Sequence, residues 1–186
     1  MNRNHRLSLS KKIVLALILA TSIGAGAYYY RTYVSEGVHE YNAVTDKAFV
    51  VNLFKQDWYW LISDFSSKDY SVDHMLDNRA ASKEESGNLI IKVYRANGIP
   101  VGFLAYYMKE LFEGRLLFVA VDKTQRSKGY ARKMVEYALN DLKKRGASVV
   151  RLITRTDNTA AQKLYKSMGF KEIWTDVAYM KFEKEL

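Results

Sequence analysis

Residues 115–135 read RLLFVAVDKTQRSKGYARKMV, and this stretch decides the fold. The apolar run at residues 115–121 is typical of a strand that is buried on both faces. A polar turn follows, and residues 131–142 then carry apolar side chains at i, i+3 and i+4, the pattern of a helix. A glycine and a small residue two positions apart, with cations on both sides, therefore lie where a strand leads into a helix.

The beginning of that helix predicts a site for an anion. The first backbone N–H groups of a helix have no partner within it, and the helix dipole is positive at that end, so phosphate groups bind there. Gly129 and Ala131 have little or no side chain, so an anion can approach the backbone closely. Three neighbouring cations would add positive charge: Arg126, Lys128 and Arg132. We expect a pyrophosphate over residues 127–132, although an ordinary strand-to-helix turn with a packing glycine has the same short pattern.

The chain before this stretch predicts helices followed by a meander of three strands. Thr45 is expected to cap a helix. The Trp58-Tyr59-Trp60 cluster at its far end is expected to lie in the core, and a clamp on the substrate is the alternative reading. Residues 64–87 are polar and predict a loop with one short helix near residues 72–76. Asn97-Gly98 joins two β-rich runs, which predicts a hairpin.

The chain after this stretch predicts a helix, a strand, a second helix and two final strands. The first helix ends near Gly146, and SVVRLIT at residues 148–154 predicts the fourth strand. NTAAQKLYKSMGF at residues 158–170 predicts a short helix, and two β-rich runs end the chain. The order of elements indicates an α/β fold with a mixed sheet.

Two of these stretches resemble the GCN5-related N-acetyltransferases, the GNAT superfamily. VAVDKTQRSKGYARKMV resembles the acetyl-CoA-binding signature Q/R-x-x-G-x-G/A, with Arg126, Gly129 and Ala131 at its fixed positions. NTAAQKLYKSMGF resembles a second motif of the family, which falls on Asn158, Ala161, Leu164, Tyr165, Gly169 and Phe170. The resemblance extends over residues 38–183 and implies a GNAT-like, mostly antiparallel sheet flanked by helices.

The resemblance also implies an activity and a cosubstrate. A GNAT enzyme transfers an acetyl group from acetyl-CoA to a primary amine, by direct attack in a ternary complex and without a metal. Its pantetheine arm would pair with the fourth strand at Phe118, Val119, Ala120 and Val121. Its pyrophosphate would lie over Ser127, Lys128, Gly129, Tyr130, Ala131 and Arg132, beside Arg126.

Two further residues of the second motif would complete the site that the resemblance implies. Asn158 would contact the cofactor, and Tyr165 would donate a proton to the departing thiolate. Each has an alternative reading, since Asn158 is also a suitable helix cap and Tyr165 a suitable half-buried aromatic residue.

The general base is the least determined part of the predicted site. Attack on a thioester requires a neutral amine, so a base has to remove a proton. Many relatives use a glutamate on the fourth strand, and Arg115 stands at the matching position here. Glu113, two residues earlier and on the same face if the strand extends that far, is the candidate, with Asp122 behind it. A solvated turn residue is an equally good reading of Glu113, so a non-catalytic GNAT-like CoA-binding or scaffold module is the alternative function.

Composition excludes several other kinds of site. The chain of 186 residues has no cysteine, and its three histidines are scattered, so disulfides, thiolate chemistry and a metal site are not expected. The net charge is +9, but no groove pattern of basic and aromatic residues is readable, so no nucleic-acid partner is expected.

The first thirty residues predict a segment directed to a membrane. Residues 13–30 carry no charge, follow a basic stretch and end in three tyrosines, as in a single-pass membrane anchor. A signal peptide cleaved near Ala27 fits the same residues. We therefore divide the chain into residues 1–34 and a GNAT-like domain at residues 38–186. The basic N-terminus predicts that the domain lies outside the cytoplasm, where acetyl-CoA is not expected, and this conflict stays open.

Overall fold

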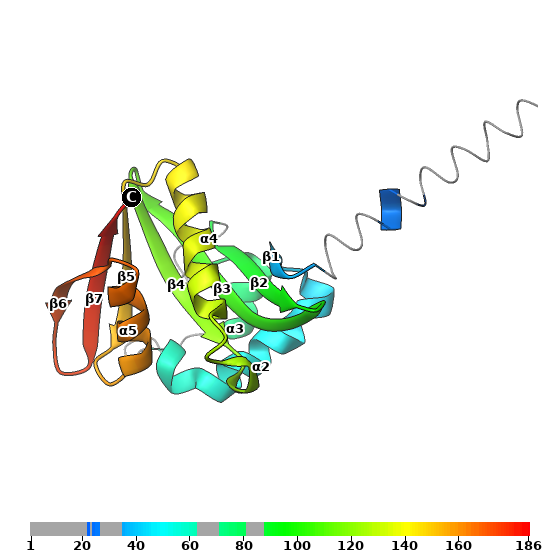
Figure 1. Ribbon diagram of the computed structural model, residues 1–186, viewed down its shortest axis with the longest axis horizontal. Helices are drawn as coiled ribbons and strands as arrows, with labels where there is room; N and C mark the ends of the chain where they lie inside the picture. Colours follow the sequence, from blue (N-terminus) through cyan, green and yellow to red (C-terminus); the bar gives the residue numbers. More distant parts are fainter. Residues whose placement is uncertain (1–21, 23, 27–34, 63–70, 81–87) are drawn as a thin grey trace, which may run out of the picture.

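The computed structural model describes residues 22, 24–26, 35–62, 71–80 and 88–186 (Figure 1). Its seven-stranded sheet has the order β1-β2-β3-β4-β5-β7-β6. The strands are β1 (Gly37–Glu40), β2 (Ile90–Ala96), β3 (Ile99–Glu110), β4 (Glu113–Val121), β5 (Val149–Arg155), β6 (Lys171–Thr175) and β7 (Tyr179–Glu185). The helices are α2 (Ala43–Leu61), α3 (Val72–Asn78), α4 (Tyr130–Lys144) and α5 (Thr159–Ser167), with a 3₁₀ turn at Lys123–Gln125.

Helices cover the two faces of the sheet in two separate hydrophobic clusters (Figure 1). On one face, buried residues of α4 such as Met134 and Leu142 pack with Leu104 of β3. On the other face, Phe54 of α2 contacts Phe118 of β4 edge to face, with 5.1 Å between the ring centroids. The sheet is therefore the middle of three layers, and a gap between its strands would connect the two faces.

Such a gap begins where β4 separates from β5. These two strands pair in parallel over only three residues of each, Glu113–Arg115 with Val149–Arg151, and all the other strand pairs are antiparallel. The register of β3 against β4 shifts just beyond this point, so that Leu117 is an extra residue in β4. A bulge of this kind bends its strand. Beyond Arg115, β4 pairs with β3 alone among the described strands.

Most of the predicted elements are confirmed. Asn97 and Gly98 form the hairpin turn with φ of 52° and 77°, the left-handed pair that a two-residue turn requires. Gly146, with φ of 98°, follows the end of α4, as predicted for a helix terminus.

Three expectations were wrong in detail, and one strand was missed. Asn42, not Thr45, caps α2, because its side chain accepts the N–H groups of Val44 and Thr45. The strand predicted from Arg115 begins at Glu113, and β1 was not anticipated. The cluster at residues 58–60 is exposed rather than buried, with 50% exposure at Tyr59.

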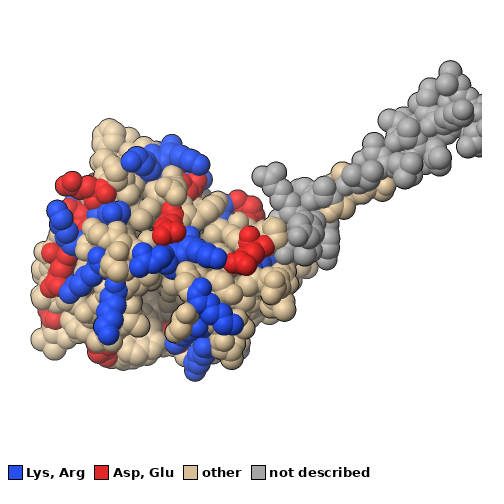
Figure 2. Space-filling view, in the orientation of Figure 1, with Lys and Arg blue, Asp and Glu red and all other residues tan. Residues whose placement is uncertain are grey.

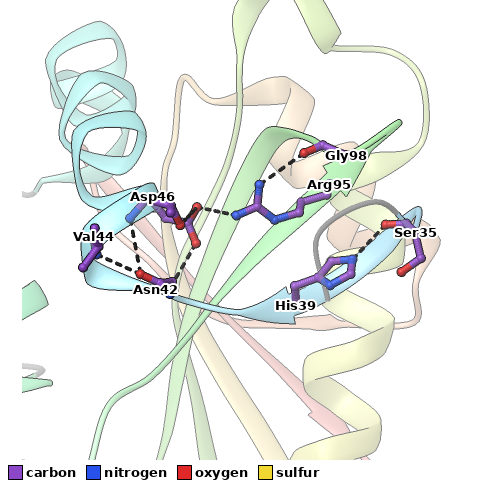
Figure 3. Close-up of polar contacts among 8 residues, drawn as sticks. Ser35, His39, Asn42, Val44, Asp46, Arg95 and Gly98 are labelled. Atoms are coloured by element: carbon purple, nitrogen blue, oxygen red, sulfur yellow. Dashed lines mark hydrogen bonds and ion pairs between the residues drawn. The ribbon is translucent and has the colours of Figure 1, made fainter. Parts of the chain in front are cut away.

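A buried ion pair fixes the first turn of α2 to the β2–β3 hairpin (Figure 3). Asp46 is fully buried, and Nη2 of Arg95 lies 2.5 Å from its Oδ1. The same carboxylate accepts the Asn42 N–H at 3.0 Å and the Thr45 hydroxyl at 3.1 Å. Arg95 also donates to the Gly98 carbonyl in the hairpin turn. The position of α2 on the sheet is therefore specified by polar contacts as well as by packing.

The predicted membrane segment at residues 13–30 lies outside the described residues, apart from 22 and 24–26. Within the part of the chain that the structure describes, no helix is both long and apolar enough to cross a membrane. The expected loop at residues 64–87 is described only at residues 71–80, which contain the short helix α3.

Candidate active site

A cleft of about 540 Å³ lies at the point where β4 and β5 separate. Its walls come from the second half of β4, the loop before α4, the end of β5 and the beginning of α5. The last turns of α2 reach it from the opposite face of the sheet. Figure 2 shows a hollow in the face that carries α4 and α5, with Lys and Arg side chains on both sides of it.

The wall on the β4 side is a strand with one unpaired edge. Residues 117–121 line the cleft, which places Phe118, Val119, Ala120 and Val121 along it as predicted. Their strand pairs with β3 on one side and, past Arg115, with no described strand on the other. Backbone N–H and C=O groups on such an edge are available to an extended ligand, as an added strand would use them.

The loop before α4 forms the floor at one end of the cleft. Ser127 and Gly129 have φ of 65° and 81°, and a Cβ built on Gly129 would meet nothing within 4 Å. No side chain caps α4, and its first backbone bond runs from the Lys133 N–H to the Gly129 carbonyl. The N–H groups of residues 130–132 therefore have no helical acceptor, and the space in front of them is open. This geometry suits a phosphate group.

The three predicted cations differ in where their side chains lie. Arg126 lines the cleft, but its guanidinium donates to the Val121 carbonyl at 3.1 Å and is ion-paired with Asp57 of α2. The other two do not line the cleft, because Lys128 donates to Gln125 and Arg132 donates to Ser167 of α5. The Arg126–Asp57 pair therefore joins the loop before α4 to α2. Asp57 lies at a kink in α2, where its φ and ψ are −123° and 24°.

The two predicted residues of the second motif lie on the opposite wall. The Asn158 side chain accepts the Ala161 N–H at 3.2 Å, so it caps α5 while lining the cleft. Tyr165 lines the cleft from α5 and is 8% exposed, with its ring against Phe170 and Phe182. Burial raises the pKa of the Tyr165 phenol to about 12, so the hydroxyl keeps its proton at neutral pH.

The structure does not bring the predicted base, Glu113, to this cleft. Glu113 begins β4 at the end where β4 and β5 are still paired, and it is ion-paired with Arg115 and Arg151. Asp122 lies beyond the other end of β4. Its carboxylate accepts hydrogen bonds from the N–H and the hydroxyl of Thr124, and the bond from the hydroxyl lowers the pKa of Asp122. Neither carboxylate lines the cleft. Glu113 and Arg115 lie on the same face of β4 and contact each other, as the alternation of side chains along a strand predicts. That alternation does not show which end of β4 borders the gap.

Residues of α2 and of the segment at the end of β5 complete the cleft, and among them only Trp60 was singled out in the sequence, as part of the aromatic cluster at residues 58–60. Asp57 and Trp60 come from α2, Ile153 comes from β5, and Asp157 comes from the turn between β5 and α5. The Tyr59 hydroxyl donates to Asp157 at 2.6 Å, which fixes that carboxylate at the mouth of the cleft. Sequence patterns cannot show these contacts, because about 100 residues separate the two partners along the chain.

Comparison with known proteins identifies the family that this arrangement matches. The sequence model of the Acetyltransferase (GNAT) family matches residues 49–170. A [ribosomal protein bS18]-alanine N-acetyltransferase from Haemophilus ducreyi is 44% identical over 63 residues, which cover 34% of this chain and 43% of that protein. N-alpha-acetyltransferase 30 from Saccharomyces cerevisiae is 33% identical over 76 residues, 39% of this chain and 43% of that protein. The match thus spans less than half the length of these relatives.

Solved structures of low sequence identity share the fold. PaiA N-acetyltransferase from Thermoplasma acidophilum, solved in complex with coenzyme A, has a TM-score of 0.64 at 18% identity. That comparison covers 82% of this chain and 99% of the other. The ribosomal-protein-S18-alanine N-acetyltransferase from Escherichia coli has a TM-score of 0.61 at 20% identity, covering 81% and 94% of the two chains.

Proposed function

This chain belongs to the acetyltransferase (GNAT) family, and from that premise we propose that it transfers an acetyl group from acetyl-CoA to a primary amine. The observation that carries the proposal is the β4–β5 gap with an uncapped helix N-terminus at one end and a buried phenol beside it. A thioester with a diphosphate tail matches these three features in one molecule.

The tail would bind at the loop before α4. The open N–H groups of residues 130–132 would donate to the pyrophosphate, and the space in front of Gly129 would admit it. The Lys and Arg side chains beside the hollow in Figure 2 supply positive charge for a ligand with several phosphates.

The pantetheine arm would lie along the unpaired edge of β4. Its amide groups would bond to the backbone of residues 117–121 in place of the missing part of β5. A β4 amide near Val119 would then polarise the thioester carbonyl, as the donors of an oxyanion hole do.

Acetyl transfer would proceed by direct attack within a ternary complex. The nitrogen of the neutral amine forms a bond to the acetyl carbon and loses one proton to water, the carbon–sulfur bond breaks, and the electron pair leaves with sulfur. The Tyr165 hydroxyl would give its proton to that thiolate, a role supported by its place in the cleft wall, and water would return a proton to the phenolate.

Asp157 would hold the incoming amine. It lines the cleft at the end of β5, and Tyr59 fixes its orientation from α2, the face of the sheet opposite the loop that would bind phosphate. Cosubstrate and acceptor would thus enter through opposite faces and meet in the gap. The relatives named for acetylating alanine of a ribosomal protein and for N-alpha acetylation support the α-amino group of a polypeptide as the acceptor.

Release of coenzyme A separates this function from a binding module without catalysis. Full-length protein is incubated with acetyl-CoA and, in turn, peptides, lysine, polyamines and no amine, and free thiol is measured. Acetyl transfer predicts thiol release that depends on an amine. A protein that binds acetyl-CoA and releases no thiol with any amine would be the non-catalytic module.

We also propose that residues 13–30 attach the domain to a membrane, on the grounds of their uncharged, basic-flanked sequence alone. Sedimentation of membranes tests this proposal. The full-length chain should pellet with them and be released by detergent, and full recovery in the supernatant without detergent would contradict it.

A further inference from the structure

One face of the β5–β7–β6 part of the sheet carries an exposed row of side chains that begins at the cleft. Ile153 of β5 lines the cleft and is 52% exposed. Lys181 of β7 is its direct neighbour across the strands, and Trp174 of β6, 43% exposed, is the neighbour of Lys181. We call Ile153, Lys181 and Trp174 the acceptor row.

The acceptor row lies on the face of the sheet that bears α2. Side chains alternate between the faces of a strand, and the flanking residues Leu152 and Phe182 are buried in the cluster under α4 and α5. The buried cluster beneath α2 and α3 takes its strand residues from β2, β3 and β4 and includes none of the described residues of β5, β6 or β7. Among the described residues, the row is therefore an exposed continuation of the mouth through which the amine would enter.

The charge of this face favours an acidic ligand. Arg151 and Arg155 flank Ile153 on the same face of β5. Arg151 is ion-paired with Glu183 and Glu113, and Arg155 donates to the Tyr59 carbonyl, so these two cations already have partners. Lys181 lies 4.7 Å from the Trp174 ring centroid and has no carboxylate partner among the described residues. A carboxylate laid along the row would meet an available cation on an aromatic platform.

The length of the row corresponds to a short peptide. Adjacent strands are about 4.8 Å apart, so the row from β5 across β7 to β6 spans roughly 10 Å, or about three residues of extended chain at about 3.3 Å each. Asp157 and Ile153 line the same cleft, so the residues that follow an amine held at Asp157 could extend past Ile153 towards Lys181 and Trp174.

We propose that the acceptor row binds the second and third residues of a polypeptide acceptor and that Lys181 selects acidic side chains there. This inference rests on the proposed function and adds the sequence class of the acceptor to it. Trp174 supplies the contact area at the edge of the sheet, and Ile153 contacts the first residue at the cleft mouth.

The test uses alaninamide and three peptides that begin with alanine and differ only at residues two and three, which are both glutamate, both glutamine or both lysine. Coenzyme A release by the full-length protein gives kcat/KM for each. We expect the glutamate peptide to exceed the lysine peptide by about tenfold, and the difference to shrink as salt screens the charges. Lys181→Glu should reverse the order of the peptides and leave alaninamide unchanged, whereas Trp174→Ala should bring all peptides towards alaninamide.

Lys184→Glu is the matched control, because it makes the same charge change on β7 at a residue paired with the buried Val150, on the opposite face. It should preserve the order of the peptides. An unchanged order in Lys181→Glu, or equal kcat/KM for alaninamide and all peptides, would overturn the acceptor row while leaving acetyl transfer intact. Absence of thiol release with alaninamide and every peptide would contradict the proposed function itself, and this inference with it.

Discussion

At the scale of single residues, the candidate site depends on the open space at Gly129 and on the side chains of Tyr165 and Asn158, which line the cleft. Gly129 leaves open space beside unpaired N–H groups, and burial raises the pKa of the Tyr165 phenol further above neutral pH. Asn158 does two things at once, since it caps α5 and faces the cleft. The alternatives that the sequence left open for Asn158 are thus compatible in the folded protein.

Tyr165→Phe tests the proposed acid. The phenylalanine ring keeps the contacts with Phe170 and Phe182, so stability and acetyl-CoA affinity should change little. The rate of the chemical step should fall about 100-fold, since a proton donor of this kind contributes at least that much. Single-turnover kinetics measures the step, and Tyr137→Phe on α4, outside the cleft, serves as control. Undiminished turnover in Tyr165→Phe would exclude it as the acid.

Gly129→Glu tests the phosphate site, with Gly146→Glu as its matched control. Both glycines have positive φ and open space around a built Cβ, so both substitutions carry a similar backbone strain of about 1–2 kcal/mol. Only the first places a carboxylate before the N-terminus of α4. We expect Gly129→Glu to lose the stabilisation by acetyl-CoA seen in thermal unfolding, and Gly146→Glu to keep it. Equal stabilisation of the two variants would contradict the site.

At the scale of elements, the cleft exists because β4 and β5 separate and because α2 is held against the opening. The polar contacts that position α2 include Asp46 with Arg95, Asp57 with Arg126, and Tyr59 with Asp157. Two of these contacts join α2 directly to cleft residues. A change in the position of α2 would therefore move Trp60 and the acceptor mouth together.

The Asp46–Arg95 pair is the contact whose loss should be most damaging to stability. Asp46→Ala leaves a buried guanidinium without its carboxylate, which should lower the free energy of unfolding by about 3–5 kcal/mol. Urea denaturation measures the change. Glu110→Gln, which removes an exposed partner of Lys109 at 3.9 Å, should change it by less than about 1 kcal/mol. A similar loss in the free energy of unfolding in both variants would contradict the claim that the buried Asp46–Arg95 pair contributes more to stability than an exposed pair.

The elements nearest to the two motifs were predictable, and the elements brought to them by folding were not. The β4–loop–α4 unit and the residues of α5 follow from local patterns, namely apolar periodicity, turn chemistry and two short motifs. Ile153 and the kink at Asp57 carry no local signal, because their roles arise from contacts between distant segments. Glu113 was misplaced for the same reason, since only the register of β4 against β5 shows which end of the strand opens.

At the scale of the whole molecule, the sheet separates two routes to one reaction centre. The face with α4 and α5 offers unpaired N–H groups and cations, which suit a nucleotide tail. The face with α2 offers Asp157, Trp60 and the acceptor row, which suit a polypeptide amine. The short parallel contact between β4 and β5 leaves the gap in which the proposed cosubstrate and acceptor would meet.

Calorimetric titration of acetyl-CoA into the folded full-length protein tests this account most directly, because every later step requires the thioester to be held in the β4–β5 gap. We predict saturable binding with one molecule per chain and a raised unfolding temperature in its presence. A protein that keeps its circular dichroism spectrum and yet shows neither binding heat nor a shift in unfolding temperature at millimolar acetyl-CoA would contradict it.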